Sequence, residues 1–247
     1  LVLLTLNGQI GYPSAITAPT WGFQDVLFKG KDLSLPREFG SYVMENVLFK
    51  VSFPAEFHAQ TAVEAAVILH SKVKDRVNDI QKIVISTHES AIRIISKEGQ
   101  LNNPADRDHC IQYMTAIGLL KGNLIAEDYE DDVASDSLID SLRSKMVIEE
   151  DPRYSKEYLE ADKRSIANAI QIYFSDGSSS DKVEVEYPIG HKRRRKEGIP
   201  LLIEKFKTNL ATQFSNSRSD EINSLCLDQS TLEKTVVSDF MNLLVAE

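Results

Sequence analysis

A change of hydrophobic periodicity in the middle of the chain most constrains what it can fold into. Residues 57–73 repeat apolar side chains at helical spacing, and residues 82–88 form a β-rich run soon after them. Two further runs, 167–174 and 182–187, alternate apolar and polar side chains around a Ser- and Gly-rich turn at 175–180. The combination predicts an α+β unit in which helices and strands share one core.

The two ends of the chain have a helical pattern instead. Residues 1–6 are typical of the end of an apolar helix that stops at Asn7-Gly8, and further helices are expected from Leu201 onward. The expected fold class is therefore α+β, with a partly present all-helical domain built from both chain ends and a smaller α+β domain inserted. The expected boundaries are 1–46 for the end of the N-terminal helical domain, 47–188 for the inserted α+β domain, and 189–247 for C-terminal helices that return to the helical domain.

The first residues also indicate what precedes them. The chain begins Leu-Val-Leu-Leu, with neither a methionine nor the basic segment that opens a signal peptide. We therefore expect it to be the C-terminal piece of a longer protein, with some of the site residues outside it.

Composition and charge argue against several classes of protein. With 28 Lys+Arg against 37 Asp+Glu, the formal net charge is −9, which disfavours binding of nucleic acid over the general surface. No apolar run approaches the ~18 residues needed to cross a bilayer. Two cysteines, Cys110 and Cys226, are too few for a thiolate zinc site or a three-thiolate iron–sulfur cluster within this chain. We expect no membrane segment, no nucleic-acid partner, and no metal or other cofactor.

Known catalytic motifs give no further guidance. The five histidines form no H-x-x-x-H pair, and the chain has no G-x-S-x-G elbow, P-loop or G-x-G-x-x-G. Three local clusters remain as candidates.

The first cluster is a strand-to-helix junction at residues 50–60. It places Lys50, Glu56, His58 and Gln60 near a helix N-terminus, where backbone N–H groups favour anions. The alternative is structural: His58 is then a core histidine beside an alanine-rich face, and Glu56 only caps the helix.

The second cluster opens a helix that we expect to run from Asn103, as N-cap, to Gly122. Arg107 lies on its first turn, and His109 and Tyr113, four residues apart, are expected to share a face. Amides, backbone donors and one guanidinium make a plausible carboxylate site. The alternative is a well-capped surface helix.

The third cluster is the basic run at residues 191–196. A run of this kind is usually a solvated loop, and in other proteins it is a nucleic-acid patch. Against the net charge of −9 it could also attract a multiply charged anion.

Five blocks of sequence closely resemble the 2-methylcitrate dehydratases of the PrpD type, within the MmgE/PrpD superfamily. The resemblance keeps its order from about residue 11 almost to the C-terminus. The blocks are residues 18–23, 42–50, 53–66, 102–113 and 187–191.

The resemblance implies a fold and an activity. The fold is a large helical domain from both chain ends with an inserted α+β domain, and roughly the first half of the enzyme lies outside this chain. The reaction is metal-free dehydration of 2-methylcitrate to 2-methyl-cis-aconitate in propionate breakdown by the methylcitrate cycle, with citrate as an open second substrate. The implied partners are a tricarboxylate substrate and a second copy in a homodimer. The compartment is the cytoplasm in bacteria and the mitochondrial matrix in fungi.

The resemblance also implies site residues. In the related cis-aconitate decarboxylases, a lysine just before the Phe-Pro-Ala block and a histidine two residues after its proline belong to the active site. Here Lys50 lies one residue further upstream and Glu56 stands at the histidine position, whereas Tyr113 matches the family tyrosine directly. The expected catalytic residues are Tyr113, His58 and Glu56. The expected substrate-binding residues are Lys50, Gln60, Asn102, Asn103, Arg107 and His109.

Three readings from other classes stay open. The chain could be a catalytically silent assembly piece of the family, or a nucleic-acid binder that uses the basic run. It could also be a related lyase or isomerase, such as a decarboxylase or epimerase, on a similar acid. Glu56 at the decarboxylase histidine position argues against this last reading.

Overall fold

The computed structural model of the protein describes residues 1–35, 38, 40 and 42–245, and these residues fall into two compact units. The units comprise residues 1–45 and residues 46–247. The first holds α1 (Val2–Leu6), α2 (Phe23–Phe28) and most of α3 (Tyr42–Asn46). Gly8, with φ +79°, follows α1 and confirms the stop expected after residue 6.

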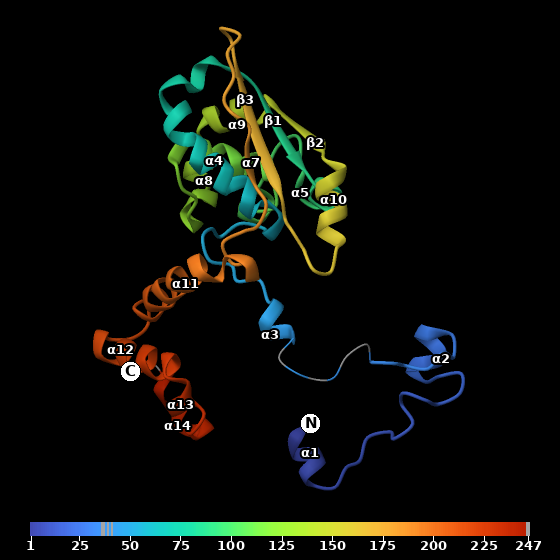
Figure 1. The fold of residues 1–247 in the computed structure, drawn as a ribbon. Coiled ribbons are helices and arrows are strands. Elements are labelled where there is room, and N and C mark those ends of the chain that lie inside the picture. The colour runs from blue at the N-terminus through green and yellow to red at the C-terminus, as the bar shows by residue number, and fades with distance from the viewer. Residues whose placement is uncertain (36–37, 39, 41, 246–247) are drawn as a thin grey trace. The chain divides into compact units, whose positions relative to one another are not determined.

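The second unit is built on a four-stranded mixed sheet (Figure 1). Its order is β2-β1-β3-β4, where β1 pairs parallel with β2 and antiparallel with β3, and β3 pairs antiparallel with β4. The strands are β1 (Ile80–Thr87), β2 (Met146–Glu150), β3 (Asn168–Phe174) and β4 (Val183–Val185). The α+β class is thereby confirmed, and so is the β3–β4 hairpin, although β4 is shorter than the run 182–187.

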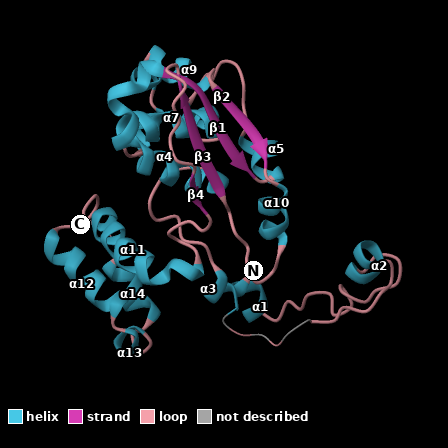
Figure 2. Ribbon diagram, turned by 45° about the horizontal axis from the view of Figure 1, so that its top comes forward, coloured by secondary structure: helices cyan, strands magenta, loops and turns pink. Residues whose placement is uncertain are grey.

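One face of this sheet is buried under helices. Ile83 and Ile85 of β1 pair with Ile172 and Ile170 of β3, and all four side chains are fully buried. α4 (Gln60–Val73) lies along this face, and α7 (Ile111–Lys121) packs on α4 (Figure 2). In the second half of β3, the less buried Gln171 and Tyr173 alternate with buried residues, whereas Ala169 in the first half is buried in a second cluster with Tyr154 of α10.

The helices α4 and α7 run parallel and are joined at both ends. At their starts, the N–H of Glu56 donates to the carbonyl of Asp108, 3.3 Å away. At their ends, Nδ1 of His70 lies 2.8 Å from the carbonyl of Leu119. Between these points Gly118 allows close approach, since a Cβ there would lie 2.9 Å from that of Ala66. The two helix starts, which carry the first two candidate clusters, are therefore adjacent.

Shorter elements complete the second unit. Among the described residues, no helix has both the length and the apolar character that crossing a membrane requires. The elements between the strands and helices above are η1 (Phe57–Ala59), η2 (Lys74–Asp79), α5 (Glu89–Ile95), α6 (Pro104–Arg107), η3 (Ala126–Tyr129), α8 (Asp131–Ala134), α9 (Ser137–Arg143) and α10 (Pro152–Leu159). The C-terminal elements are η4 (Lys192–Arg194), α11 (Arg195–Leu210), α12 (Asn216–Leu227), α13 (Gln229–Leu232) and α14 (Val237–Leu243).

The expected continuous helix from Asn103 to Gly122 is wrong. Asn103 does cap α6, and Gly122 ends α7 with φ +67°, but the chain leaves the helical conformation between the two helices. Cys110 has extended dihedral angles (φ −125°, ψ 106°), and the carbonyl of Asp108 accepts from Glu56. The break lets this segment meet the start of η1.

The basic run at residues 191–196 is neither a solvated loop nor a free patch. Arg194 forms ion pairs with Glu64 of α4, at 2.9 Å, and with Glu197, at 2.8 Å. Arg195 donates to the carbonyl of Val47, 2.9 Å away, and its guanidinium lies 4.4 Å from the ring centre of Phe49. The run therefore fastens α11 to the α/β part, and the charge of Arg194 is neutralised by two carboxylates.

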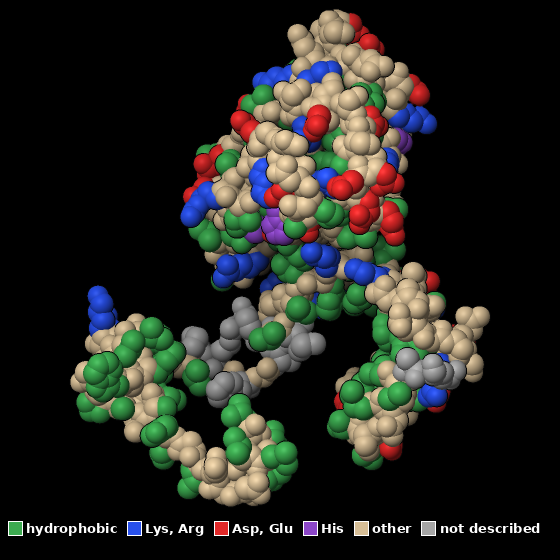
Figure 3. Space-filling model, turned by 180° about the vertical axis from the view of Figure 1, so that it is seen from behind, with side chains coloured by type: hydrophobic (Ala, Val, Ile, Leu, Met, Phe, Trp, Pro, Cys, Tyr) green, Lys and Arg blue, Asp and Glu red, His purple; other side chains and the backbone are tan. Residues whose placement is uncertain are grey.

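Large hydrophobic side chains remain exposed in both terminal regions. Figure 3 shows them gathered on the surface of residues near the two chain ends, whereas charged side chains gather over the α/β part. Contiguous exposed apolar surface marks a place where another protein surface packs. That both chain ends belong to one helical domain, with a boundary after residue 188, stays a prediction.

We predict that Gly190→Ala strongly destabilises the protein. Gly190 is buried, its carbonyl accepts from the N–H of Phe49 at 3.1 Å, and an added Cβ would lie only 1.6 Å from the carbonyl oxygen of Phe49. The backbones must separate, at a cost of about 1–3 kcal/mol or more. Urea denaturation should show a lower midpoint, whereas the control Gly11→Ala, with nothing within 4 Å of the added Cβ, should leave it unchanged. Equal midpoints for both variants would contradict the contact.

Candidate active site

The strand-to-helix junction brings Glu56 and His58 into direct contact. Glu56 is the N-cap of η1, and its carboxylate accepts from the backbone N–H of His58 at 2.8 Å. The other carboxylate oxygen lies 2.8 Å from Nδ1 of His58. Burial by itself would raise the pKa of Glu56, but the hydrogen bonds and the charge of His58 outweigh it and lower that pKa. The carboxylate is therefore ionised and fixes which imidazole nitrogen carries hydrogen.

Two residues that the sequence analysis did not select complete this cluster. Tyr158 of α10 places its hydroxyl 3.3 Å from Nε2 of His58. His88, directly after β1, stacks on Tyr158 with 4.8 Å between ring centres and lies 5.1 Å from the ring of His58. One signal could have revealed His88: it ends a buried β run and begins a helix, the place where α/β proteins put functional side chains.

His88 is an unusual buried group. Its side chain is fully buried, and neither ring nitrogen forms a hydrogen bond of normal geometry. Burial lowers its pKa from 6.5 to about 4, the charge of His58 adds to this, and the backbone of Ala167 and the charge of Glu56 oppose it. At neutral pH the ring is uncharged.

The other two predicted residues of the junction have separate environments. Gln60 is buried, and its amide donates to the carbonyls of Phe53, at 2.8 Å, and Ala55, at 3.0 Å. It therefore closes the loop that precedes η1. Lys50 is exposed, and its carbonyl accepts from Nζ of Lys205 at 2.6 Å.

The second candidate cluster splits between surface and interior. Asn102, Asn103 and His109 are exposed, and the ring of His109 lies 2.5 Å from the carboxylate of Asp108. Tyr113 is buried and donates its hydroxyl to the carbonyl of Asp128 at 2.7 Å. The expectation that His109 and Tyr113 share a helix face is wrong. The helix is interrupted at residues 108–110, so His109 precedes α7 and Tyr113 lies within it.

Burial also changes the acidity of Tyr113. It raises the pKa of the phenol to about 12, with the nearby charge of Arg107 opposing the shift. The hydroxyl is therefore neutral at physiological pH.

Arg107 and Tyr113 nevertheless share a cavity. Arg107 is buried, donates to the carbonyl of Tyr129 at 2.5 Å, and pairs with the exposed carboxylate of Asp131 at 2.6 Å. Both side chains line a cavity of about 330 Å³, together with Asn102 and Arg143.

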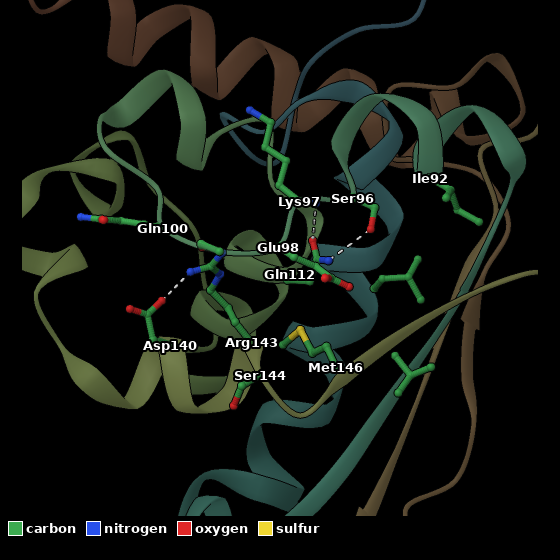
Figure 4. Close-up of a pocket in the computed structure, with 13 residues that line it drawn as sticks. Ile92, Ser96, Lys97, Glu98, Gln100, Gln112, Asp140, Arg143, Ser144 and Met146 are labelled. Carbon is green, nitrogen blue, oxygen red and sulfur yellow. Dashed lines mark hydrogen bonds and ion pairs between the residues drawn. The ribbon is translucent and has the colours of Figure 1, made fainter.

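A larger cavity lies next to this one. It has a volume of about 780 Å³ and shares Gln100, Asp140 and Arg143 with the smaller cavity. Figure 4 shows Arg143 between Asp140 and Gln112 at its wall. Sequence analysis did not select Arg143. Its guanidinium reaches the cavities only because α9 packs beside α7 in the folded chain.

The two candidate clusters are in contact, and the two cavities described above are lined by residues of the second cluster. The hydrogen bond between Glu56 N–H and the carbonyl of Asp108 connects them. Among the described residues, the linings of the two cavities include Arg107 and Tyr113 but neither Glu56 nor His58. A common cleft for both clusters, and the catalytic and binding roles assigned to their residues, stay predictions. Within the described part of the chain, no three His, Cys, Asp or Glu side chains are grouped so as to hold a metal ion.

We predict that His88 makes stability pH-dependent. Its pKa is 6.5 when unfolded and about 4 when folded, so the unfolded state binds the proton more readily between these values. The stabilisation is complete above about pH 6.5 and is lost as the pH falls towards 4, by up to about 1.4 kcal/mol per pH unit. Denaturation midpoints measured from pH 7 to 4 should fall less steeply for His88→Gln than for the wild type and for the exposed control His109→Gln. Parallel curves for all three proteins would refute this.

Comparison with known proteins places these residues in a family. Residues 53–229 match the MmgE/PrpD C-terminal domain, a range that includes both candidate clusters except Lys50. The chain is 56% identical over 248 aligned residues, 99% of its length, to the 2-methylcitrate dehydratase of Salmonella typhimurium, of which it covers 51%. It is 53% identical over 98% of its length to that of Cupriavidus necator, covering 51%, and 52% identical over 99% of its length to the mitochondrial one of Yarrowia lipolytica, covering 47%. The chain spans about half the length of these relatives and belongs to the MmgE/PrpD family.

Proposed function

We propose that the chain is part of a metal-independent 2-methylcitrate dehydratase, which converts 2-methylcitrate to 2-methyl-cis-aconitate in propionate catabolism. The observation that carries the proposal is the 56% identity to the Salmonella typhimurium 2-methylcitrate dehydratase along 99% of this chain. Citrate, which lacks only a methyl group, is proposed as a second substrate.

The chemistry of dehydration requires groups of the kind that this chain provides. A proton must leave a carbon next to a carboxylate, a hydroxyl must leave with a proton, and cations must hold three carboxylates. Glu56 and His58 form an acid–base pair, with 2.8 Å between Oε1 and Nδ1. Arg107 lines the smaller cavity and Lys50 is exposed beside the junction. We propose these two cations as carboxylate-binding residues.

Metal independence is supported by the donor set of this chain. Its two cysteines, Cys110 in the core and Cys226 in α12, cannot provide the three thiolates of an aconitase-type cluster. The acid–base work is then proposed to fall to protein side chains.

The proposal includes a second part of the protein. Because the chain covers 51% of the Salmonella relative, we propose that a preceding helical region supplies the remaining walls of the active site and that the complete protein is a homodimer. The exposed apolar side chains near both chain ends support such packing. We propose a cytoplasmic enzyme if the source is bacterial and a mitochondrial-matrix enzyme if it is fungal, as the relative named mitochondrial suggests.

The decisive experiment compares the complete protein with this chain alone. We predict that the complete protein dehydrates 2-methylcitrate, followed by the absorbance of the product's conjugated double bond, and keeps its rate after dialysis against a strong chelator. The chain alone should be inactive, because the preceding region is proposed to supply the remaining walls of the site. Loss of activity that iron restores would overturn metal independence. A complete protein without activity on 2-methylcitrate or citrate would favour a silent assembly role.

A second prediction tests Arg107 as a carboxylate-binding residue. Arg107→Ala should raise KM at least tenfold with a smaller effect on kcat, if the guanidinium binds the ground state and the transition state alike. Asp131→Asn is the control for a purely structural role of Arg107. It removes the same ion pair, at 2.6 Å, but keeps the guanidinium. We expect Asp131→Asn not to raise KM. Two results would show that Arg107 only holds α8 in place: a KM of Arg107→Ala equal to that of the wild type, or equal increases in KM for Arg107→Ala and Asp131→Asn.

A further inference from the structure

Two side chains at the start of η1 and one from α10 form a chain of hydrogen bonds. The carboxylate of Glu56 only accepts, so Nδ1 of His58, 2.8 Å away, carries the hydrogen. Nε2 of His58 then has a free lone pair, and the hydroxyl of Tyr158, 3.3 Å away, donates to it. Each group orients the next one, which is the arrangement by which enzymes activate a side chain through a base and a carboxylate.

Tyr158 is the outer end of this chain. Glu56, His58 and Tyr158 are all partly buried. The hydroxyl of Tyr158 donates to His58, and its oxygen keeps a lone pair that can accept a substrate proton.

His88 contacts two members of this chain through its ring. Its ring stacks on Tyr158 at 4.8 Å with 23° between the ring planes, and it touches His58 at 5.1 Å. Neither ring nitrogen of His88 forms a hydrogen bond of normal geometry, so its printed ring contacts are those with Tyr158 and His58. Because His88 stays neutral, its ring adds no positive charge beside His58.

The cluster lies beside the carboxyl ends of the parallel strands β1 and β2 of this mixed sheet. β1 and β2 are parallel, so their carboxyl ends meet at one edge of the sheet, and α5 and α10 begin there. Figures 1 and 2 both show α5 and α10 side by side at that edge. Ligands of parallel α/β sheets bind outside the carboxyl ends of the strands.

We propose that Tyr158 is the residue that exchanges a proton with the substrate, that Glu56 and His58 form the relay behind it, and that His88 is a positioning residue for Tyr158. This rests on the proposed dehydration. As the C–H bond breaks, its electron pair forms the carbon–carbon double bond and its proton goes to Tyr158 Oη, while the phenolic proton moves to His58 Nε2. The C–O bond breaks with its electron pair on oxygen. The leaving oxygen takes the stored proton back from the relay and departs as water, so the relay returns to its starting state.

The test combines kinetics with a measurement that does not need turnover. In the complete protein, Tyr158→Phe keeps the stacked ring and removes the hydroxyl, so kcat should fall by ~10²–10⁴ with an unchanged melting temperature. The double variant Tyr158→Phe/His58→Gln should be no slower than the slower single variant, because the two groups act as a unit. The matched control is Tyr154→Phe on the same helix, whose ring packs on Ala167 and Ala169 and which should keep the wild-type rate.

Nuclear magnetic resonance supplies the independent readout. The ¹⁵N resonance of His58 Nε2 should move in Tyr158→Phe and in His88→Ala, and should stay in place in Tyr154→Phe. His88→Phe, which restores a stacked ring, should return kcat towards the wild-type value where His88→Ala does not. A Tyr158→Phe enzyme within threefold of the wild-type rate, or an unmoved resonance, overturns the relay. The wild-type protein could fail to turn over 2-methylcitrate and citrate while the His58 Nε2 resonance still moves in Tyr158→Phe. That result overturns the proposed function and leaves the hydrogen-bonded chain standing.

Discussion

The close packing of α4 against α7 is the constraint on which both candidate clusters depend. Gly118 and the small side chain of Ala66 let the two helices run parallel at short distance, and α4 in turn covers the buried face of the sheet. Because the helices are parallel, their N-termini lie together, and the loop before η1 meets the break between α6 and α7. The hydrogen bond from Glu56 to Asp108 is the local result. A larger residue at position 118 would separate not only two helices but also the two sets of polar groups that precede them.

The arginines of the basic run at residues 191–196 bind other parts of the chain. The basic run looks in sequence like a patch for a polyanion, yet Arg194 is held by two carboxylates and Arg195 covers the ring of Phe49. Burial opposes the charge of Arg194, but its hydrogen bonds to Glu197 and Glu64 outweigh that and raise its pKa further. A guanidinium bound in this way has few donors left for phosphate, so the run's composition alone is a poor guide to its partners.

Local sequence signals predicted the helices and strands that carry their own markers. The helical spacing before residue 73, the β run that became β1, the Asn103 cap and the stop at Gly122 were all recognisable. β2 was not, because it is a half-exposed edge strand with two glutamates. α10 was overlooked, although Asp151 and Pro152 mark its start. Tyr158 was missed because its contact with His58 spans 100 residues of sequence. Pairings of this length depend on the completed sheet, which no local pattern encodes.

The two clusters provide different chemical groups: one has groups that can transfer protons, and the other has a buried cation. The Glu56–His58–Tyr158 chain has proton donors and acceptors, whereas the nearby Arg107 already holds Asp131, whose side chain is 83% exposed. An ion pair with so exposed a partner is weak, and most of its energy is screened by water. A substrate carboxylate that enters the cavity can therefore replace Asp131 at little cost and keep the buried guanidinium paired. Under the proposed function, Arg107 is a carboxylate-binding group with Asp131 as its replaceable partner, and the proton chemistry comes from the Glu56–His58–Tyr158 chain at the neighbouring helix start.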